Sequence, residues 1–282
     1  MEPGKAVWIL SGRFGRATVN LNDRALVEHA HRQINILLKL GGADAHFLVD
    51  GKELALNDAS MLLFNSWLPH GKLAGPPCLI LSLFIEPDWL GDALPHTEAR
   101  VTELFADAQV TLTEEVHIQA SRLATAITAQ HRASQEQCER LLLDLVDAIV
   151  AQYAGDAAER SLMPRRQMID FRIRKALAYM QANSLRSLQM EELARQVGLS
   201  RSRFFEQFRR CVGTSPQQYA DYIRVTTATR LLSTTDLSLA ELADELGFAG
   251  HSNFTRFFTQ HIGVPPSEFR RQTSDAEMMA VH

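Results

Sequence analysis

Two short stretches of the sequence combine phenylalanines at helical spacing with a face of hydrogen-bonding side chains. In "GFAGHSNFTRFF", Phe254, Phe257 and Phe258 fall at the i, i+3, i+4 spacing of a buried helical stripe. The polar residues around them are His251, Ser252, Asn253, Thr255 and Arg256. Such side chains can pair with base edges, and an α-helix fits the major groove of DNA. Because residues 247–262 contain no Asp, Glu or Cys, we expect this face to recognise bases and not to catalyse a reaction.

The same pattern occurs earlier, so the C-terminal third contains an internal repeat. "LARQVGLSRSRFFEQF" and "LADELGFAGHSNFTRFF" align with an offset of 49 before a turn and 50 after it, because one residue is added before His251. In each copy a short helix ends at a glycine, Gly198 or Gly247, that can adopt the left-handed conformation, and a second helix follows. Each copy therefore predicts a helix-turn-helix. The exposed face of the first copy carries Arg201, Ser202, Arg203, Glu206, Arg209 and Arg210.

Between the copies, the segment from Pro216 to about Ser233 predicts a single bridging helix. Such a helix would hold two recognition helices on one side of DNA, in successive major grooves about 34 Å apart. A merely soluble helix face would show more Lys and Glu in i, i+4 pairs than these stretches do. We therefore favour DNA recognition over a solvated surface.

The charge distribution is consistent with this interpretation. Residues 165–272 contain 16 Lys and Arg against 10 Asp and Glu, a charge of +6, whereas the whole chain carries −4. An acidic part joined to a basic part indicates that only the second meets a polyanion. Arginine-rich solvated helices would give the same totals, so charge alone does not decide between the two.

The first 90 residues or so read as β-structure. Short apolar or alternating runs are separated by turn residues, which is typical of a sandwich or a barrel. Two helices are predicted next, Glu114–His131 and Ser134–Tyr153, with leucine-rich apolar faces. These faces could pack against the chain's own β-structure or form a dimer interface, and we expect both roles, with dimerisation favoured. Residues 155–166, which include Met163-Pro164, are the expected interdomain linker.

The C-terminal part resembles the double helix-turn-helix domain of the AraC/XylS family of bacterial transcription regulators. The residues that carry the resemblance are Leu242-Ala243, Gly247-Phe248, Ser252, Phe254, Arg256, Phe258, Gly263, Pro265-Pro266 and Phe269-Arg270. The resemblance implies that DNA is contacted by Arg201, Ser202, Arg203, Phe205, Glu206, Arg209, Arg210, His251, Ser252, Asn253, Thr255 and Arg256. Arg201, Arg209 and Arg210 are better placed for phosphates, which supply affinity without sequence information. Two positions depart from the family pattern: Glu206 stands where Arg is usual, and Thr259 where Lys or Arg is usual.

The resemblance also implies a cupin-like, effector-binding β-barrel before the DNA-binding part, so the expected fold is α+β with two domains. The expected segments are 1–97 (cupin-like barrel), 98–154 (helical dimerisation segment), 155–166 (linker), 167–272 (double helix-turn-helix, all-α) and 273–282 (flexible tail). Many cupins hold a metal through an H-x-H pair, a glutamate and a later histidine. Here His29 and His31 fall on one face of an expected strand, and His70 follows, but no glutamate has the family spacing. We therefore expect these three histidines to line an organic-ligand pocket, with metal binding the less favoured role and no cofactor required.

The function expected from these features is an effector-controlled regulator, more often an activator in this family, that binds double-stranded DNA as a homodimer. An activator would also contact RNA polymerase. The alternative is a metal-dependent cupin enzyme fused to a DNA-binding domain. The sequence shows no signal peptide and no membrane-spanning run, and its three scattered cysteines suggest no disulfide framework, so we expect a reduced, cytoplasmic protein without a membrane partner.

Overall fold

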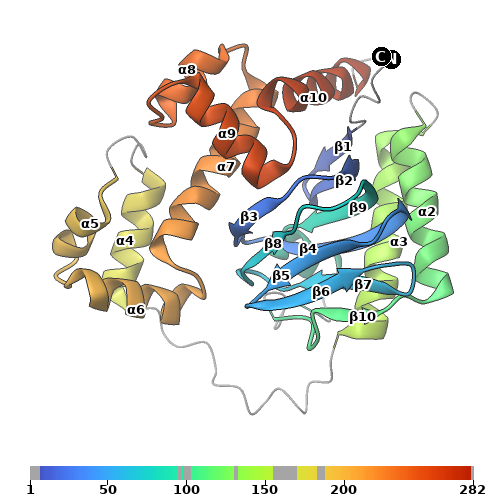
Figure 1. The fold of residues 1–282 in the computed structure, drawn as a ribbon, viewed down its shortest axis with the longest axis horizontal. Helices are drawn as coiled ribbons and strands as arrows, with labels where there is room; N and C mark the ends of the chain where they lie inside the picture. Colours follow the sequence, from blue (N-terminus) through green and yellow to red (C-terminus); the bar gives the residue numbers. More distant parts are fainter. Residues whose placement is uncertain are drawn as a thin grey trace.

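The computed structural model describes residues 7–94, 97, 103–129, 133–154, 170–182 and 188–280. Its first part consists of antiparallel strands, and its second part consists of helices (Figure 1). The strands are β1 (Val7–Gly12), β2 (Gly15–Asn22), β3 (Leu26–His29), β4 (Ile34–Gly42), β5 (Ala45–Val49), β6 (Lys52–Leu56), β7 (Ser60–Phe64), β8 (His70–Lys72), β9 (Cys78–Ile85) and β10 (Gln109–Thr111).

The strands form two sheets of unequal size. The larger has the order β1-β2-β9-β4-β7-β10, and the smaller has the order β3-β8-β5-β6. Over the described residues the two sheets are not closed into a barrel, so the expected cupin-like barrel is replaced by two separate antiparallel sheets. The smaller sheet packs on the β4-β7 region of the larger one through a core that includes Leu37, Phe47, Leu56 and Phe64.

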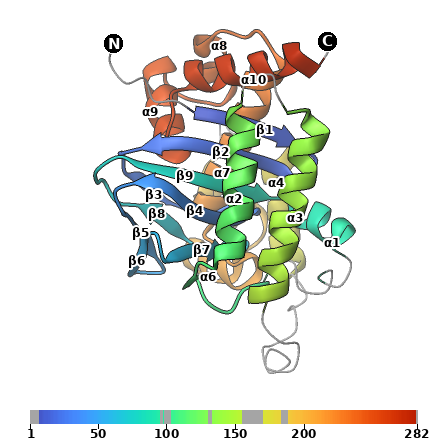
Figure 2. The ribbon, with the colours of Figure 1, turned by 90° about the vertical axis from the view of Figure 1, so that its right-hand side faces the viewer.

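The opposite face of the larger sheet is covered by two helices, α2 (Glu114–Thr128) and α3 (Gln135–Tyr153), which lie in front of the strands in Figure 2. Alternate residues of the strands, such as Val19 and Leu83, point to this face and pack with Leu123 and Leu145. The predicted helix pair is therefore present, and its apolar side is occupied by the sheet of the same chain. A short helix α1 (Pro87–Ala93) follows β9.

Two of the expected boundaries differ from the structure. Strand β10 pairs with β7 through Gln109–Thr111, so the β-structure continues beyond residue 97. Helix α10 (Pro266–Ala280) continues through most of the expected tail at 273–282. The expected linker at 155–166 lies outside the described residues.

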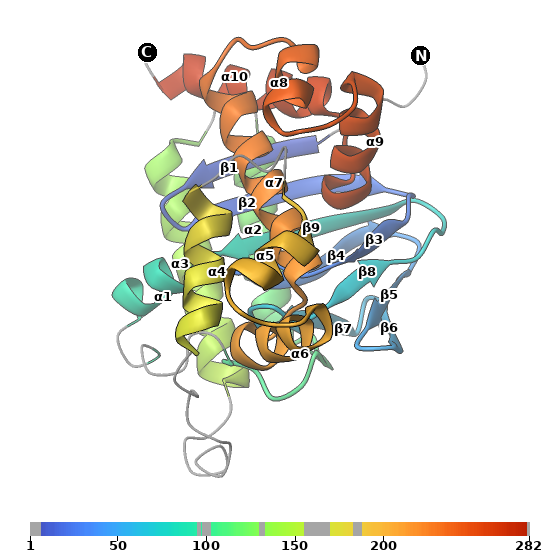
Figure 3. The same ribbon diagram turned by 90° about the vertical axis from the view of Figure 1, so that its left-hand side faces the viewer.

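The C-terminal helices form two small bundles joined by one long helix (Figure 3). The helices are α4 (Phe171–Ala182), α5 (Met190–Gln196), α6 (Arg201–Val212), α7 (Pro216–Thr234), α8 (Leu239–Glu245), α9 (His251–Ile262) and α10. The first half of α7 packs in the core of α4–α6, and its second half packs in the core of α8–α10. The predicted bridging helix is thus confirmed. None of the helices in the described ranges is long and apolar enough to cross a membrane.

The turns inside both helix-turn-helix units use the predicted glycines. Gly198 and Gly247 have φ values of +72° and +78°, which lie in the left-handed region. The starts of α5 and α8 differ: Ser238 and Glu241 form a complete capping box at α8, whereas Gln189 makes no side-chain cap at α5. The first helix of the second unit is therefore the more firmly held.

The difference between the N-terminal caps of α5 and α8 can be tested with a pair of substitutions. Ser238→Ala removes the acceptor for the Glu241 amide and should lower local stability by about 1 kcal/mol, which is about fivefold faster amide hydrogen exchange in α8. Gln189→Ala should leave the exchange of α5 nearly unchanged, because no side-chain cap is lost. Equal effects of the two substitutions would contradict this account of the caps.

Candidate nucleic-acid interface and interdomain cleft

Helix α6 exposes the polar face that the sequence predicts. Phe204 and Phe208 are fully buried, and the predicted residues Arg201, Ser202, Arg203, Glu206, Arg209 and Arg210 are exposed. Phe205 is half-buried under the Arg201 guanidinium, whose carbon lies 5.0 Å from the ring centre. Arg201 also pairs with Glu191 of α5 at 2.7 Å, and Arg203 pairs with Glu206 at 3.2 Å. The N-terminal half of α6 thus presents charged and hydroxyl groups to solvent on a rigid helix.

Helix α9 repeats this arrangement with fewer charges. Phe254 and Phe258 are fully buried, and Phe257 is only half-buried, beside the ring of His261. The predicted residues His251, Ser252, Asn253 and Arg256 are exposed, and Thr255 is half-buried. Arg256 donates to the Asn253 side chain at 3.3 Å, so the two groups are held side by side. The predicted DNA-contacting residues therefore form two faces on separate helices, which α7 connects.

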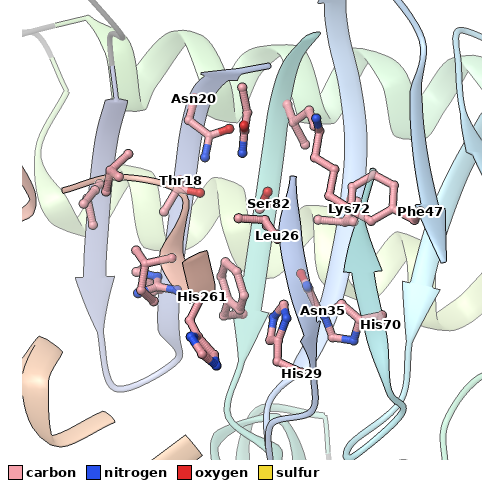
Figure 4. A pocket seen from close by; sticks show the side chains of 18 of the residues that line it. Thr18, Asn20, Leu26, His29, Asn35, Phe47, His70, Lys72, Ser82 and His261 are labelled. Atoms are coloured by element: carbon pink, nitrogen blue, oxygen red, sulfur yellow. The ribbon is translucent and has the colours of Figure 1, made fainter. Parts of the chain in front are cut away.

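A cleft of about 590 Å³ separates the larger sheet from the DNA-binding helices. One wall is formed by β2, β9 and the β3–β4 connection, and the other by α7, the end of α9 and α10. At its inner end lies a smaller cavity of about 50 Å³ with the polar side chains of Thr18, Asn20, Asn35 and Ser82 (Figure 4). The smaller sheet also lines this cavity, through Leu26, Phe47 and Lys72, so the cavity lies between the two sheets.

Arg16 on β2 is a buried cation of this cleft, whose lining also includes Arg230 and the carboxylates of Glu28, Glu86 and Asp221. Its guanidinium carbon lies 4.4 Å from the ring centre of Phe84 and 5.9 Å from that of Phe269 on α10. Its buried Nε has no hydrogen-bond partner, and no carboxylate of the described residues pairs with it. Burial lowers the pKa of Arg16 to about 10, so the group remains a cation at neutral pH. An unpaired cation in a partly apolar cleft favours an anionic occupant.

The structure brings the three predicted histidines together at the same cleft. One ring nitrogen from each of His29, His31 and His70 lies within 4.8 Å of the others. His29 ends β3 and pairs in register with His70 of β8, while His31 lies two residues beyond the strand. His31 and His70 are 8% and 3% exposed. Figure 4 shows His29 between His70 and a fourth histidine, His261 of α9; the ring centres of His29 and His261 are 6.1 Å apart.

The three rings are held in a single tautomer. The Nδ1 atoms of His29, His31 and His70 donate to the carbonyl oxygens of Val27, Gln33 and Leu68 at 2.8, 2.9 and 2.8 Å. Burial, together with a smaller effect of the neighbouring histidine, lowers the pKa of each ring to about 3. The rings are therefore neutral at pH 7, and each Nε2 carries a lone pair.

Trp67 connects this cluster to helix α7. The Trp67 amide donates to the His31 carbonyl at 2.8 Å, and the indole lies 5.3 and 5.1 Å from the rings of Tyr219 and Tyr222. Its φ of +66° places a bulky residue in the left-handed region, at a cost on the order of 1–3 kcal/mol. The contacts on both sides hold this conformation in place.

Sequence reasoning missed Arg16, Trp67 and His261. Arg16 and Trp67 carry no local signal, because their roles arise only when helices distant in sequence pack on the sheet. His261 did carry a local signal. When the two copies of the repeat are aligned with an offset of 50, His261 falls opposite Cys211, so the copies differ at this position. That difference could have directed attention to the end of the second recognition helix.

Two helix-turn-helix units with exposed polar recognition helices define a DNA-binding protein. A family model described as "Helix-turn-helix domain" matches residues 193–272. The melibiose operon regulatory protein of Escherichia coli (strain K12) is 22% identical over 260 residues, which cover 86% of this chain and 83% of that protein. The lactose operon transcription activator of Staphylococcus xylosus is 28% identical over 102 residues, 36% of this chain and 37% of that protein. Residues 193–272 thus match a helix-turn-helix family, and the relatives are transcription regulators, which supports the predicted resemblance to the AraC/XylS regulators.

Solved structures of ToxT from Vibrio cholerae share the overall fold. The apo form of a ToxT variant is 12% identical with a TM-score of 0.55, and the alignment covers 95% of this chain and 96% of that one. Another ToxT structure, bound to an unsaturated fatty acid, is 13% identical with a TM-score of 0.53 and 94% coverage of both chains. The likeness extends over both parts of the chain, so the order of a β-sheet part followed by a helix-turn-helix part is shared.

Proposed function

We propose that this protein regulates transcription by reading an operator with α6 and α9, under the control of a small-molecule effector bound in the interdomain cleft. The observation that carries the proposal is the pair of exposed polar faces on α6 and α9, both fixed to α7 by fully buried phenylalanines. Footprinting across a genome, which locates the bound sites, is the direct test.

The proposed DNA-contacting residues fall into two groups, those that face the groove and those that contact phosphates. Ser202, Arg203, Phe205 and Glu206 of α6, and His251, Ser252, Asn253, Thr255 and Arg256 of α9, are proposed to face the groove. Arg201, Arg209 and Arg210 are proposed to contact phosphates. Glu206 is an acceptor and would favour the N4 amino group of cytosine, where an arginine would favour guanine.

Arg256→Ala should weaken binding to the cognate operator by about 1–3 kcal/mol and relax the preference at one or two base pairs. Arg209→Ala is the comparison, because a lost phosphate contact should weaken binding on all sequences and reduce the slope of log K against log salt by about 1. Fluorescence anisotropy on a set of single-base operator variants, at several salt concentrations, distinguishes the two. A uniform loss with Arg256→Ala would assign Arg256 to phosphate.

The effector is proposed to be an organic anion. The guanidinium of Arg16 would bind a carboxylate or similar group, and the rings of Phe84 and Phe269 would pack on apolar parts of the ligand. ToxT was solved with a fatty acid and with a substituted butenoic acid, both of which are carboxylic acids. Because the cleft is lined by α7, α9 and α10, an occupant would act directly on the DNA-binding helices.

A panel of carboxylic acids and their primary amides, measured by thermal denaturation, tests this proposal. At least one acid should raise the melting temperature while its amide does not, and the effect should disappear in Arg16→Gln. Arg13→Gln is the matched control, because Arg13 is exposed three residues away and does not line the cleft. An acid that stabilises Arg16→Gln as well as the parent protein would exclude Arg16 as the binding group.

A homodimer, activation through RNA polymerase and a cytoplasmic location remain part of the proposal. We also propose residues 98–154 as the dimerisation segment and 155–166 as the linker. Because the inner faces of α2 and α3 pack on the sheet, a dimer must use their outer faces, where Ile118 is 44% exposed. The lactose regulator of Staphylococcus xylosus is named an activator, which supports an activating role.

Ile118→Glu should convert the dimer into a monomer of 31.6 kDa in light scattering after size exclusion. Leu73→Glu, on another apolar residue that is 38% exposed, should leave the dimer intact. A parent protein that is already monomeric at micromolar concentration would rule out the proposed interface.

A further inference from the structure

The histidine cluster of His29, His31 and His70 contains buried Nε2 acceptors that lack hydrogen-bond donors in the described part of the chain. Each Nδ1 is used by a backbone carbonyl, so the neutral ring must carry its proton there, and Nε2 can only accept. The Nε2 atoms of His31 and His70 are buried and have no partner among the described residues. An unsatisfied buried acceptor costs about 1–3 kcal/mol, so a native cluster of this kind indicates an occupant.

A single water molecule does not satisfy the cluster. Water has two O–H donors, whereas His29, His31 and His70 together offer three lone pairs. A metal ion accepts all three at once, and backbone-anchored histidines are the usual ligands of such ions, since the Nδ1 hydrogen bond fixes the ring orientation.

The spacing also fits an ion. Three atoms no more than 4.8 Å apart lie within about 2.8 Å of a common point, and a Zn–N bond is about 2.1 Å. Each ring would therefore move by less than about 1 Å. Three imidazole nitrogens without a carboxylate suit zinc, copper, nickel or iron and do not suit magnesium or calcium.

We propose that His29, His31 and His70 form a binding site for a divalent transition-metal ion of the zinc type, at the wall of the cleft that faces helix α9. With three protein ligands, the ion keeps a coordination position for a ligand from the cleft. This inference extends the proposed function but does not depend on it, since the ion site is complete within the β-structure.

Two contacts would transmit the presence of the ion to the DNA-binding part. His261 lies next to His29, and its Nδ1 also donates to a backbone carbonyl, that of Phe257 at 2.8 Å, so its Nε2 is free to accept. The backbone of His31 is bonded to Trp67, which packs on Tyr219 and Tyr222 of α7. An ion at the cluster would therefore stiffen the docking of both α7 and α9.

Binding is tested on the full chain, expressed without a polyhistidine tag and treated with EDTA. Zn²⁺ should bind at one equivalent per chain in calorimetry and elemental analysis, and Co²⁺ should give the visible absorption bands of a low-coordinate nitrogen site. His29→Gln and His70→Gln should each weaken Zn²⁺ binding by about 100-fold or more, whereas His46→Gln, at a half-exposed histidine on β5, should not change it.

Folding of the variants is checked independently by circular dichroism without metal. His29→Gln lies at the less buried edge of the cluster, so it tests the site even if His70→Gln is unstable. Binding weaker than about 100 µM, or binding that persists in His29→Gln, would overturn the ion site. DNA binding by the EDTA-treated protein is measured in parallel, so failure of the ion site and failure of the proposed function are separate results.

The coupling is tested by hydrogen exchange. Zn²⁺ should slow amide exchange in α9 of the parent protein, and His261→Gln should retain the bound zinc but lose this protection. Zinc binding without protection of α9 would refute the coupling and leave the ion site established.

Discussion

The unequal size of the two sheets is the constraint on which the rest of the structure depends. The smaller sheet covers the β4-β7 side of the larger one, and β1, β2 and part of β9 extend beyond it. Helices α7, α9 and α10 lie over this part of the sheet. Because the larger sheet contributes Arg16, Thr18, Asn20 and Ser82, the space between it, the smaller sheet and the helices is a polar cleft and not a second core. The cleft and the surface on which α7, α9 and α10 dock therefore share one wall.

The two helix-turn-helix copies have different neighbours as a result. The second copy packs its recognition helix α9 on β3, with His261 and Ile262 at the cleft. In the first copy the contact is made by α7, through Tyr219 and Tyr222 on Trp67. The two copies therefore differ in their contacts with the β-structure, although the repeat makes them alike in sequence.

Helical periodicity and glycine turns were sufficient to predict α5 to α9, the bridging helix and the exposed reading faces, because these depend on contacts close in the sequence. The meeting of the three histidines was also predicted from the sequence, but it was argued from strand alternation, and His31 in fact lies beyond the end of β3. A closed barrel was expected from family resemblance, and the structure shows two separate sheets. Strand β10 was missed because three residues, Gln109–Thr111, carry too little alternation to reveal pairing with a strand almost 50 residues earlier. The roles of Arg16 and Trp67 depend on contacts across the whole chain, which local patterns cannot report.

The length of helix α7 sets the relative placement of the two helical bundles. Its 19 residues rise about 28 Å, and each end belongs to a different bundle core, so it fixes both the distance and the rotation between the two readers. One residue added within α7 would turn one bundle by about 100° relative to the other, so α6 and α9 would lose their present relative orientation. The length of α7 is therefore constrained by the relative orientation of the two bundles, whereas its surface side chains are constrained where they line the cleft.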